Sequence, residues 1–170
     1  SVNGKAAGFG GRSLCLYQAP PNETAFDVQV KVRLDDEAGA AGLAFASDGG
    51  DRHYGFYPSG GQLRLTHFAG PDVFSWNILA DVPVPSYRQG EWNHLRVVVD
   101  GATITGYVNG NEVVSVEHEA LRGGQVGLCK FRDTAASFQA FSLGEAGAVE
   151  QIDPALNEAL NQWLKEPNED

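Results

Sequence analysis

The 170-residue sequence contains no methionine, only two cysteines and no long apolar run. Two cysteines are too few for a disulfide framework or for a structural zinc site, which needs more ligands at close spacing. A membrane-spanning helix needs about 18 or more consecutive apolar residues, so no membrane partner is expected. These absences favour a chain that folds around its own apolar core.

Basic residues are also scarce, since 12 lysines and arginines stand against 22 acidic residues and give a net charge of −10. Proteins that bind nucleic acids or anionic membranes neutralise phosphates with Lys and Arg, so no nucleic-acid partner is expected. The 42% content of hydrophobic residues is enough for one domain with its own core.

The acidic charge is concentrated at the end of the chain. Residues 145–170 hold seven acids and one base, Lys165, whereas residues 1–144 hold fifteen acids and eleven bases. After Asp153, apolar residues recur at the spacing of one helix face, at Leu156, Ala159, Leu160, Trp163 and Leu164. We therefore expect a domain over residues 1–144, and an acidic linker with a short C-terminal α-helix over 145–170. The apolar stripe either packs on the domain or contacts other domains of a larger protein.

The body of the chain consists of short alternating or apolar runs bounded by Gly, Asn, Asp and Pro, which is typical of an antiparallel sandwich or barrel. Strands are predicted near residues 13–18, 26–34, 41–46, 53–57, 62–68, 73–79, 94–100, 103–108, 112–116, 125–130 and 136–143. The pairs Asp100-Gly101 and Asn109-Gly110 are expected to form type I′ turns of a meander, because these residues tolerate positive φ.

Alternation within the strands predicts which side chains are buried. The buried set is Leu43, Phe45, Tyr54, Phe56, Leu63, Leu65, Leu95, Val97, Val99, Ile104 and Val108. The opposite set is His53, Tyr57, Arg64 and Thr66 on some strands and His94, Arg96, Thr105 and Tyr107 on others. Trp76 shares one face with Phe74 and Ile78, and this face points either outward or into the core.

A polar but aromatic outer surface suits stacking on sugar rings and hydrogen bonding to sugar hydroxyls. The candidate ligand-binding residues are therefore His53, Tyr57, Arg64, Trp76, Arg96 and Tyr107. The same side chains also fit a purely structural role, because cross-strand aromatic and Arg neighbours stabilise sheets.

A family likeness is carried by the segment that begins Trp92-Asn93-His94-Leu95-Arg96-Val97-Val98-Val99-Asp100-Gly101 and ends Tyr107-Val108-Asn109-Gly110. It resembles the hairpin of concanavalin A-like jelly rolls, used by the laminin G-like and 3-keto-disaccharide hydrolase branches. Segments 41–45, 51–56, 124–128 and 138–143 resemble other strands of this group in the same order. The resemblance implies an all-β fold, a two-sheet antiparallel jelly-roll β-sandwich. It also implies that a concave face or loop rim binds glycans, sometimes with calcium, and that some branches cleave glycosides.

No catalytic residue is assigned from the sequence. Glycoside hydrolysis generally uses two carboxylates across a cleft, and the E-x-D-x-x-E string of concanavalin-like glucanases does not occur in this sequence. Glu117 and Glu119 lie two residues apart, but in a predicted loop. A hydrolase would have to draw its acids from separate strands or loops, such as Asp51, Asp72 or Glu117.

Calcium is the one cofactor that the sequence suggests. Asp48 and Asp51 flank two glycines that can turn carbonyl oxygens inward, and Asp72 offers a further carboxylate. The same residues also fit an ordinary loop. His53, His67, His94 and His118 show no close spacing, so no zinc site is predicted.

The family fold commonly pairs the first strand near the penultimate one, which implies that Cys15 lies beside Cys129. The two residues either form a disulfide or remain buried thiols. We expect a periplasmic or secreted location, with which the acidic, Lys-poor composition is compatible. A disulfide would support this location. The leading hypothesis is a non-catalytic carbohydrate-binding module of a larger protein. The alternatives are a glycosidase of the 3-keto-disaccharide hydrolase type and a structural or protein-interaction domain.

Overall fold

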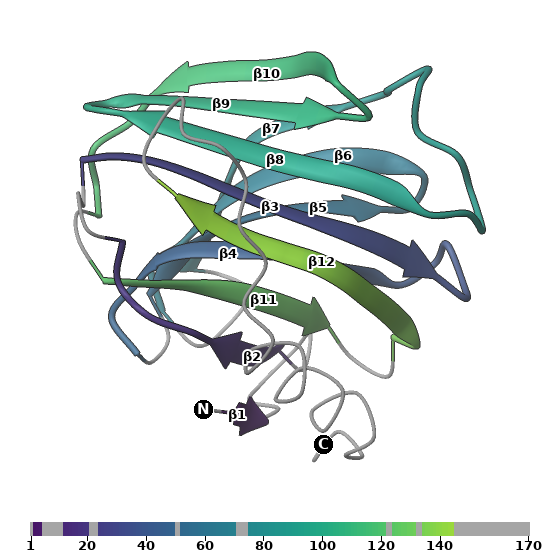
Figure 1. The fold of residues 1–170 in the computed structure, drawn as a ribbon, viewed down its shortest axis with the longest axis horizontal. Helices are drawn as coiled ribbons and strands as arrows, with labels where there is room; N and C mark the ends of the chain where they lie inside the picture. Colours follow the sequence, from purple (N-terminus) through teal and green to yellow (C-terminus); the bar gives the residue numbers. More distant parts are fainter. Residues whose placement is uncertain are drawn as a thin grey trace.

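The computed structural model describes residues 2–4, 12–20, 24–49, 52–70, 75–121, 124–131 and 134–144, which form two antiparallel sheets (Figure 1). The seven-stranded sheet has the order β1 (Val2–Gly4), β2 (Arg12–Leu16), β11 (Gln125–Phe131), β4 (Ala40–Ser47), β5 (His53–Ser59), β6 (Gln62–Phe68) and β7 (Trp76–Val82). The five-stranded sheet has the order β10 (Asn111–Glu117), β9 (Thr103–Val108), β8 (Asn93–Asp100), β3 (Ala25–Leu34) and β12 (Ala136–Gly144).

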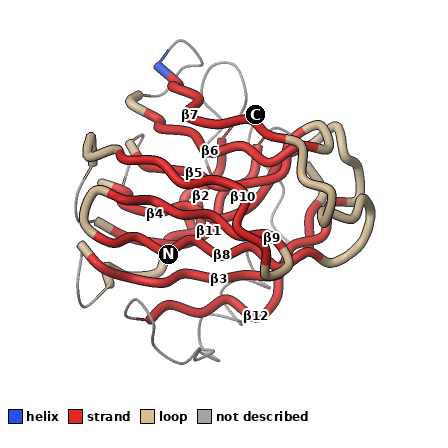
Figure 2. The backbone as a smooth tube through the Cα atoms, turned by 90° about the horizontal axis from the view of Figure 1, so that it is seen from above, coloured by secondary structure: helices blue, strands red, loops and turns tan. Residues whose placement is uncertain are grey.

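The main core lies between the two sheets, whose strands run side by side with the connecting loops gathered at their ends (Figure 2). Every residue predicted to be buried belongs to this core. The prediction of an all-β, two-sheet jelly-roll sandwich is therefore confirmed. The structure describes no helix long and apolar enough to cross a membrane. The predicted C-terminal helix and the boundary near residue 144 concern a segment that lies outside the described residues.

The predicted strands all occur, with ends that differ by at most three residues. The largest difference is at β7, which begins at Trp76 and ends at Val82. Its ladder with β6 contains a bulge, a register shift between Leu65 and Thr66. This bulge leaves Ile78 on the outer side, where its side chain is 52% exposed. The core therefore does not take the Trp76 and Ile78 face. Strand β1 was not predicted, because three residues are too short to show alternation.

One of the two hairpin turns is the predicted type. Asn109 and Gly110 both have positive φ, 51° and 85°, as a type I′ turn requires. The prediction for Asp100-Gly101 is wrong, because Asp100 pairs with Thr103 and the two turn residues are Gly101 and Ala102. Only Gly101 has positive φ, 60°, which is the pattern of a type II′ turn.

The asparagines of the hairpin motif hold the loop that precedes β8. The buried Asn93 Oδ1 accepts hydrogen bonds from the Arg88 N–H at 2.8 Å and from Asn109 Nδ2 at 3.0 Å. Asn109 Oδ1 in turn accepts from the His94 N–H at 2.8 Å. These residues are thus structural, since they satisfy buried backbone groups.

The cysteines lie in adjacent strands but on opposite sides of the sheet. In the β2–β11 ladder Cys15 pairs with Leu128 and Cys129 pairs with Leu14, a register offset of one residue. Because side chains alternate along a strand, Cys15 enters the main core while Cys129 points to the outer face. The structure therefore contains two buried thiols and no Cys15–Cys129 disulfide.

The outer face of the seven-stranded sheet carries a second apolar cluster. This outer cluster consists of Leu14, Leu16, Ala40, Ala44, Tyr57, Phe68, Cys129 and Phe131, with Trp76 packed against it. His53, Tyr57 and Thr66 lie on this face as predicted, but they are only 0%, 2% and 0% exposed. The expectation of an open polar surface is therefore wrong at these positions. Alternation predicts the face of a side chain and not whether that face is covered.

Candidate functional site

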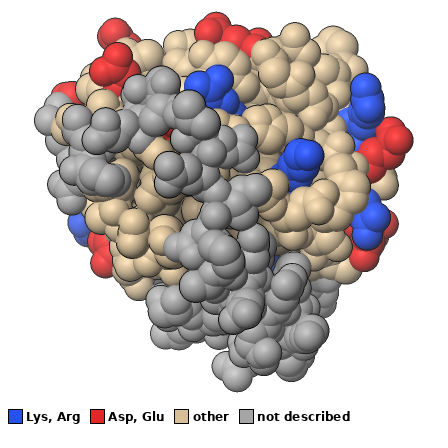
Figure 3. All heavy atoms as spheres, viewed as in Figure 1, with Lys and Arg blue, Asp and Glu red and all other residues tan. Residues whose placement is uncertain are grey.

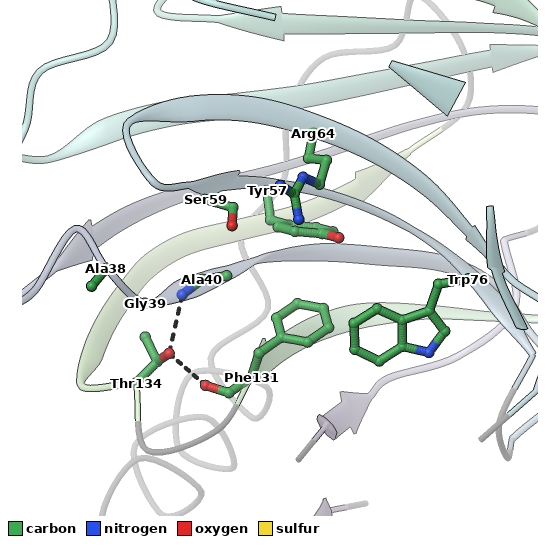
Figure 4. Close-up of a pocket in the computed structure, with 9 residues that line it drawn as sticks. All are labelled: Ala38, Gly39, Ala40, Tyr57, Ser59, Arg64, Trp76, Phe131 and Thr134. Carbon is green, nitrogen blue, oxygen red and sulfur yellow. Dashed lines mark hydrogen bonds between the residues drawn. The ribbon is translucent and has the colours of Figure 1, made fainter. Parts of the chain in front are cut away.

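A hollow of about 420 Å³, counted with the solvent space at its mouth, lies against the outer cluster (Figure 4). Five strands line it: Ala40 belongs to β4, Tyr57 and Ser59 to β5, Arg64 to β6, Trp76 to β7 and Phe131 to β11. Residues 38–40 and Thr134 complete the lining. Three of the six candidate ligand-binding residues, Tyr57, Arg64 and Trp76, are thus brought to one place.

Aromatic rings form the wall of the hollow. The rings of Tyr57 and Phe131 lie 4.7 Å apart between centroids, and those of Trp76 and Phe131 lie 5.7 Å apart in an edge arrangement. Phe68 packs behind them, with its centroid 4.9 Å from that of Trp76. This mutual packing fixes the ring planes before any ligand arrives, as stacking on a flat apolar ligand requires.

Thr134 closes one end of the hollow. Its hydroxyl accepts a hydrogen bond from the Ala40 N–H at 3.0 Å and donates to the Phe131 carbonyl. A Cβ at Gly39 would lie 2.6 Å from the Thr134 hydroxyl oxygen, so only glycine lets the two segments approach this closely. The turn after β11 is therefore anchored to the start of β4.

Arg64 is the basic group of the hollow, and its guanidinium lies beside the Tyr57 ring in Figure 4. Its Nη2 contacts Asp81 Oδ2 on the neighbouring strand at 3.3 Å, and both side chains remain about one third exposed, at 31% and 34%. The Nε–H of Arg64 is buried and makes no hydrogen bond with any described residue. The guanidinium also interacts with the Tyr57 side chain, and only its exposed part can reach a ligand.

Tyr57 supplies the hydroxyl of the hollow. It shares a hydrogen bond of 2.9 Å with Thr66 Oγ1, in which either oxygen can donate. Burial raises the pKa of Tyr57 to about 12. The phenol is therefore protonated at neutral pH, where it can orient a ligand but is a poor proton acceptor.

Two of the remaining three candidates, Arg96 and Tyr107, lie on the five-stranded sheet. Arg96 donates from Nε and Nη2 to Asp27, whose side chain is 4% exposed, at 3.0 Å and 2.6 Å. Its guanidinium also covers the Tyr107 ring, with 5.1 Å between the guanidinium carbon and the ring centroid. Figure 3, in the orientation of Figure 1, shows scattered basic side chains on this side, several of them beside acidic ones.

His53, the sixth candidate, belongs to the outer face but does not line the hollow. Its ring stacks on Phe68 at 4.5 Å between centroids, and its Nδ1 lies 2.8 Å from the Tyr54 carbonyl oxygen. Phe131 and Thr134 line the hollow but were missed. Phe131 lies one residue beyond the predicted strand 125–130, and its alternation with Cys129 was the signal that could have identified it.

The predicted calcium ligands are described only in part. Asp48 is exposed, and its Oδ1 accepts a hydrogen bond from the Arg52 N–H at 3.3 Å, which closes the β4–β5 loop. Asp51 and Asp72 lie outside the described residues, so calcium binding stays a prediction. Among the residues that the structure describes, no group of three His, Cys, Asp or Glu side chains is placed to hold a metal ion.

The described lining of the hollow contains no Asp or Glu. Asp81 is the acid paired with Arg64, whereas Glu117 and Glu119 are exposed at the end of β10 and just after it. The site thus offers aromatic faces, hydroxyls and a guanidinium, which bind and orient a polar, ring-shaped ligand.

Comparison with known proteins identifies both a family and a fold. The model of the 3-keto-alpha-glucoside-1,2-lyase-like domain matches residues 7–139. The carbohydrate-binding module CBM66 from Bacillus subtilis has a similar structure, with a TM-score of 0.66 at 18% identity over 79% of this chain and 82% of that one. A toad ovary galectin in complex with thio-digalactose gives a TM-score of 0.55 at 10% identity over 74% and 95%. A Bacillus subtilis protein of unknown function with a galectin-like fold gives 0.61 at 11% identity over 79% and 76%. The comparison with curated proteins finds no match.

Proposed function

Because the chain belongs to the 3-keto-alpha-glucoside-1,2-lyase-like domain family, we propose that it binds a carbohydrate in the hollow on the outer face of its seven-stranded sheet. The observation that carries this proposal is the convergence of three aromatic rings, Tyr57, Trp76 and Phe131, with the partly exposed guanidinium of Arg64. Sugar rings present apolar C–H faces and hydroxyl edges, which match aromatic faces and a guanidinium.

The structural neighbours support the class of ligand. One is a carbohydrate-binding module and another is a galectin crystallised with a galactose derivative. Identities of 18% and 10% show a shared fold and not a shared sugar. The proposal therefore extends to a carbohydrate of unspecified identity.

Binding is favoured over cleavage by the chemistry of the hollow. Elimination from a 3-keto-glucoside would need a base to remove the proton beside the carbonyl group. The pKa of Tyr57, raised to about 12, makes its phenol a poor base at neutral pH, and Asp81 is paired with Arg64. No described residue of the lining is otherwise an acid or a histidine.

Cleavage of a 3-keto-glucoside is the second candidate function, and the family match is the observation that favours it. Its acids would come from Asp51, Asp72 or Glu117. The protein is incubated with a 3-keto-glucoside and the released sugar is measured. Turnover that is abolished in one of the three alanine variants would establish this activity, whereas a rate equal to that without protein would exclude it.

The binding proposal is tested by titrating the protein with a panel of oligo- and polysaccharides, first in the wild type and then in Trp76→Ala. We expect the substitution to weaken binding at least tenfold, because it removes one wall of the hollow (about 1.4 kcal/mol per tenfold). Trp92→Ala is the matched control, since the Trp92 ring packs under Arg33, away from the hollow, with 5.1 Å between the guanidinium carbon and the ring centroid. Circular dichroism establishes that both variants fold.

Two results would contradict the binding proposal. One is the lack of any binding at millimolar ligand across the panel. The other is an equal loss of affinity in the Trp76 and Trp92 variants, because that result would place the ligand elsewhere or reflect general destabilisation.

A further inference from the structure

One wall of the hollow is built from the turn between β3 and β4. This 38–40 wall consists of two alanines around a glycine and lies at the end of the hollow away from Trp76 (Figure 4). The Ala38 N–H donates to Asp36 Oδ1 at 2.9 Å, and the Gly39 N–H donates to the Asp36 carbonyl at 2.9 Å. These bonds shape the turn itself, but they do not fix its position relative to the other walls.

Glu37 connects the turn to two other loops. Its Oε1 accepts a hydrogen bond from the Tyr87 hydroxyl at 2.6 Å, and its Oε2 accepts one from the Gly90 N–H at 2.9 Å. Its main-chain carbonyl accepts from the Gly60 N–H at 3.1 Å, directly after the lining residue Ser59. Both carboxylate oxygens of Glu37 are therefore engaged, although Glu37 itself does not line the hollow.

The contact between Tyr87 and Glu37 is a strong one. Burial, followed by the hydrogen bond to Glu37 and by the charge of Glu37, raises the pKa of Tyr87 well above its ordinary value. The phenol therefore keeps its proton and donates it. A hydrogen bond from a neutral donor to an ionised carboxylate is stronger than one between two neutral groups.

The loop of residues 86–90 is itself fixed by the hairpin motif. Asn109 Nδ2 donates to the Ser86 carbonyl at 2.7 Å. The Asn93 side chain accepts from the Arg88 N–H and donates to the Arg88 carbonyl, both at 2.8 Å. A continuous set of hydrogen bonds thus runs from the hairpin motif of the five-stranded sheet, through this loop, to the 38–40 wall on the other sheet.

We propose that Glu37 is a positioning residue of the carbohydrate site, whose carboxylate holds the 38–40 wall in place before a sugar binds. This inference rests on the proposed function, because it concerns a wall of the same hollow. Thr134 holds the Ala40 end of the wall, and Glu37 holds the other end. A wall that is ordered in advance spares the ligand the free energy that ordering the turn would cost.

The first test compares affinities of variants of the full chain by calorimetric titration with the panel glycan that binds the wild type most tightly. Glu37→Ala removes both carboxylate contacts and should weaken binding about fivefold or more. Glu37→Gln should stay within about twofold of the wild type, because its amide oxygen can accept from Gly90 while its amide nitrogen donates to the Tyr87 oxygen. Tyr87→Phe removes one contact and should lie between the two.

Asp27→Ala is the matched control. Asp27 pairs with Arg96 on the five-stranded sheet, so its loss destabilises the fold without touching the hollow, and affinity should be that of the wild type. A second measurement needs no ligand. Amide hydrogen exchange of the 38–40 wall under native conditions should become about tenfold faster in Glu37→Ala. It should keep the wild-type rate in Asp27→Ala.

Unchanged exchange of the 38–40 wall in Glu37→Ala would overturn the proposal, and so would unchanged affinity in that variant. An equal loss of affinity in Glu37→Ala and Asp27→Ala would do the same, because general destabilisation would explain it. Affinity as low in Glu37→Gln as in Glu37→Ala would show that the charge acts and not the contacts, and would also contradict the proposal. A wild type that binds no glycan would contradict the proposed function, whereas the exchange measurement would still show whether Glu37 fixes the wall.

Discussion

Each outer face of the sandwich presents an arginine paired with an aspartate on the neighbouring strand, yet the two pairs are held differently. On the five-stranded sheet, Arg96 makes two donor contacts of 3.0 Å and 2.6 Å to Asp27 Oδ2, and the Asp27 side chain is 4% exposed. On the seven-stranded sheet, Arg64 makes one contact of 3.3 Å to Asp81, which is 34% exposed. The first arginine is occupied, whereas the second retains donors.

The aromatic neighbours differ in the same direction. Tyr107 lies under the Arg96 guanidinium and completes a structural contact. Tyr57 lies beside Arg64 within a cluster of packed rings that surrounds a hollow. Similar residues on the two faces therefore have different roles. A binding face needs a rigid apolar support together with polar groups that the fold has not used.

The largest expected difference between the faces is in packing. Phe68→Ala should lower the free energy of unfolding by about 3 kcal/mol or more, because a fully buried ring of the outer cluster is lost. Tyr107→Ala on the other face should cost under about 1 kcal/mol, since that side chain is partly exposed. Urea unfolding measures both. Equal losses of unfolding free energy in the two variants would mean that the outer cluster does not stabilise the fold as a packed core does.

The second largest difference in unfolding free energy is expected between variants of the two aspartates. Asp27→Ala should lower the free energy of unfolding by about 2 kcal/mol, because it removes the partner of Arg96 from a buried position. Asp81→Ala should cost under about 0.5 kcal/mol, as is usual for an exposed ion pair. The same urea experiment applies. A larger cost at Asp81 would show that Arg64 is structural.

Replacement of each arginine by lysine should weaken ligand binding on one face and lower stability on the other. Arg64→Lys should weaken carbohydrate binding about tenfold, because an ammonium group cannot reproduce the planar donors of a guanidinium. Arg96→Lys should leave affinity unchanged while lowering the unfolding temperature. Calorimetric titration with the ligand found in the panel measures affinity. Loss of binding in Arg96→Lys alone would mean that the carbohydrate binds on the five-stranded sheet and not in the hollow.

The smallest effect concerns the Tyr57 hydroxyl. Tyr57→Phe should cost about 1 kcal/mol at pH 7, through loss of the hydrogen bond to Thr66. The folded-state pKa of about 12 lies above the ordinary tyrosine pKa of 10.0. Stability from the protonated phenol is therefore complete below pH 10 and is lost as the pH rises from 10 toward 12. Unfolding measured from pH 7 to 12 should show a shallower alkaline decline in Tyr57→Phe.

The sequence predicted every strand except β1 and every residue of the buried set, because alternation is a local property of each strand. It placed Tyr57, Arg64 and Trp76 among the candidates for the same reason. It could not separate them from Arg96 and Tyr107, since which sheet a strand joins depends on pairing between distant segments. The register shift opposite Leu65 likewise exposed Ile78 without any sign in the sequence of β7.

The sequence by itself determined which residues extend, which face each takes, and where the Asn109-Gly110 turn falls. The tertiary structure decided the rest. It covered His53, Tyr57 and Thr66, it placed Cys15 and Cys129 on opposite sides of one sheet, and it brought His67 beside His118. The reason is physical: alternation and turn preference act over a few residues, whereas strand register and the packing of two sheets fix distances between residues far apart in the chain.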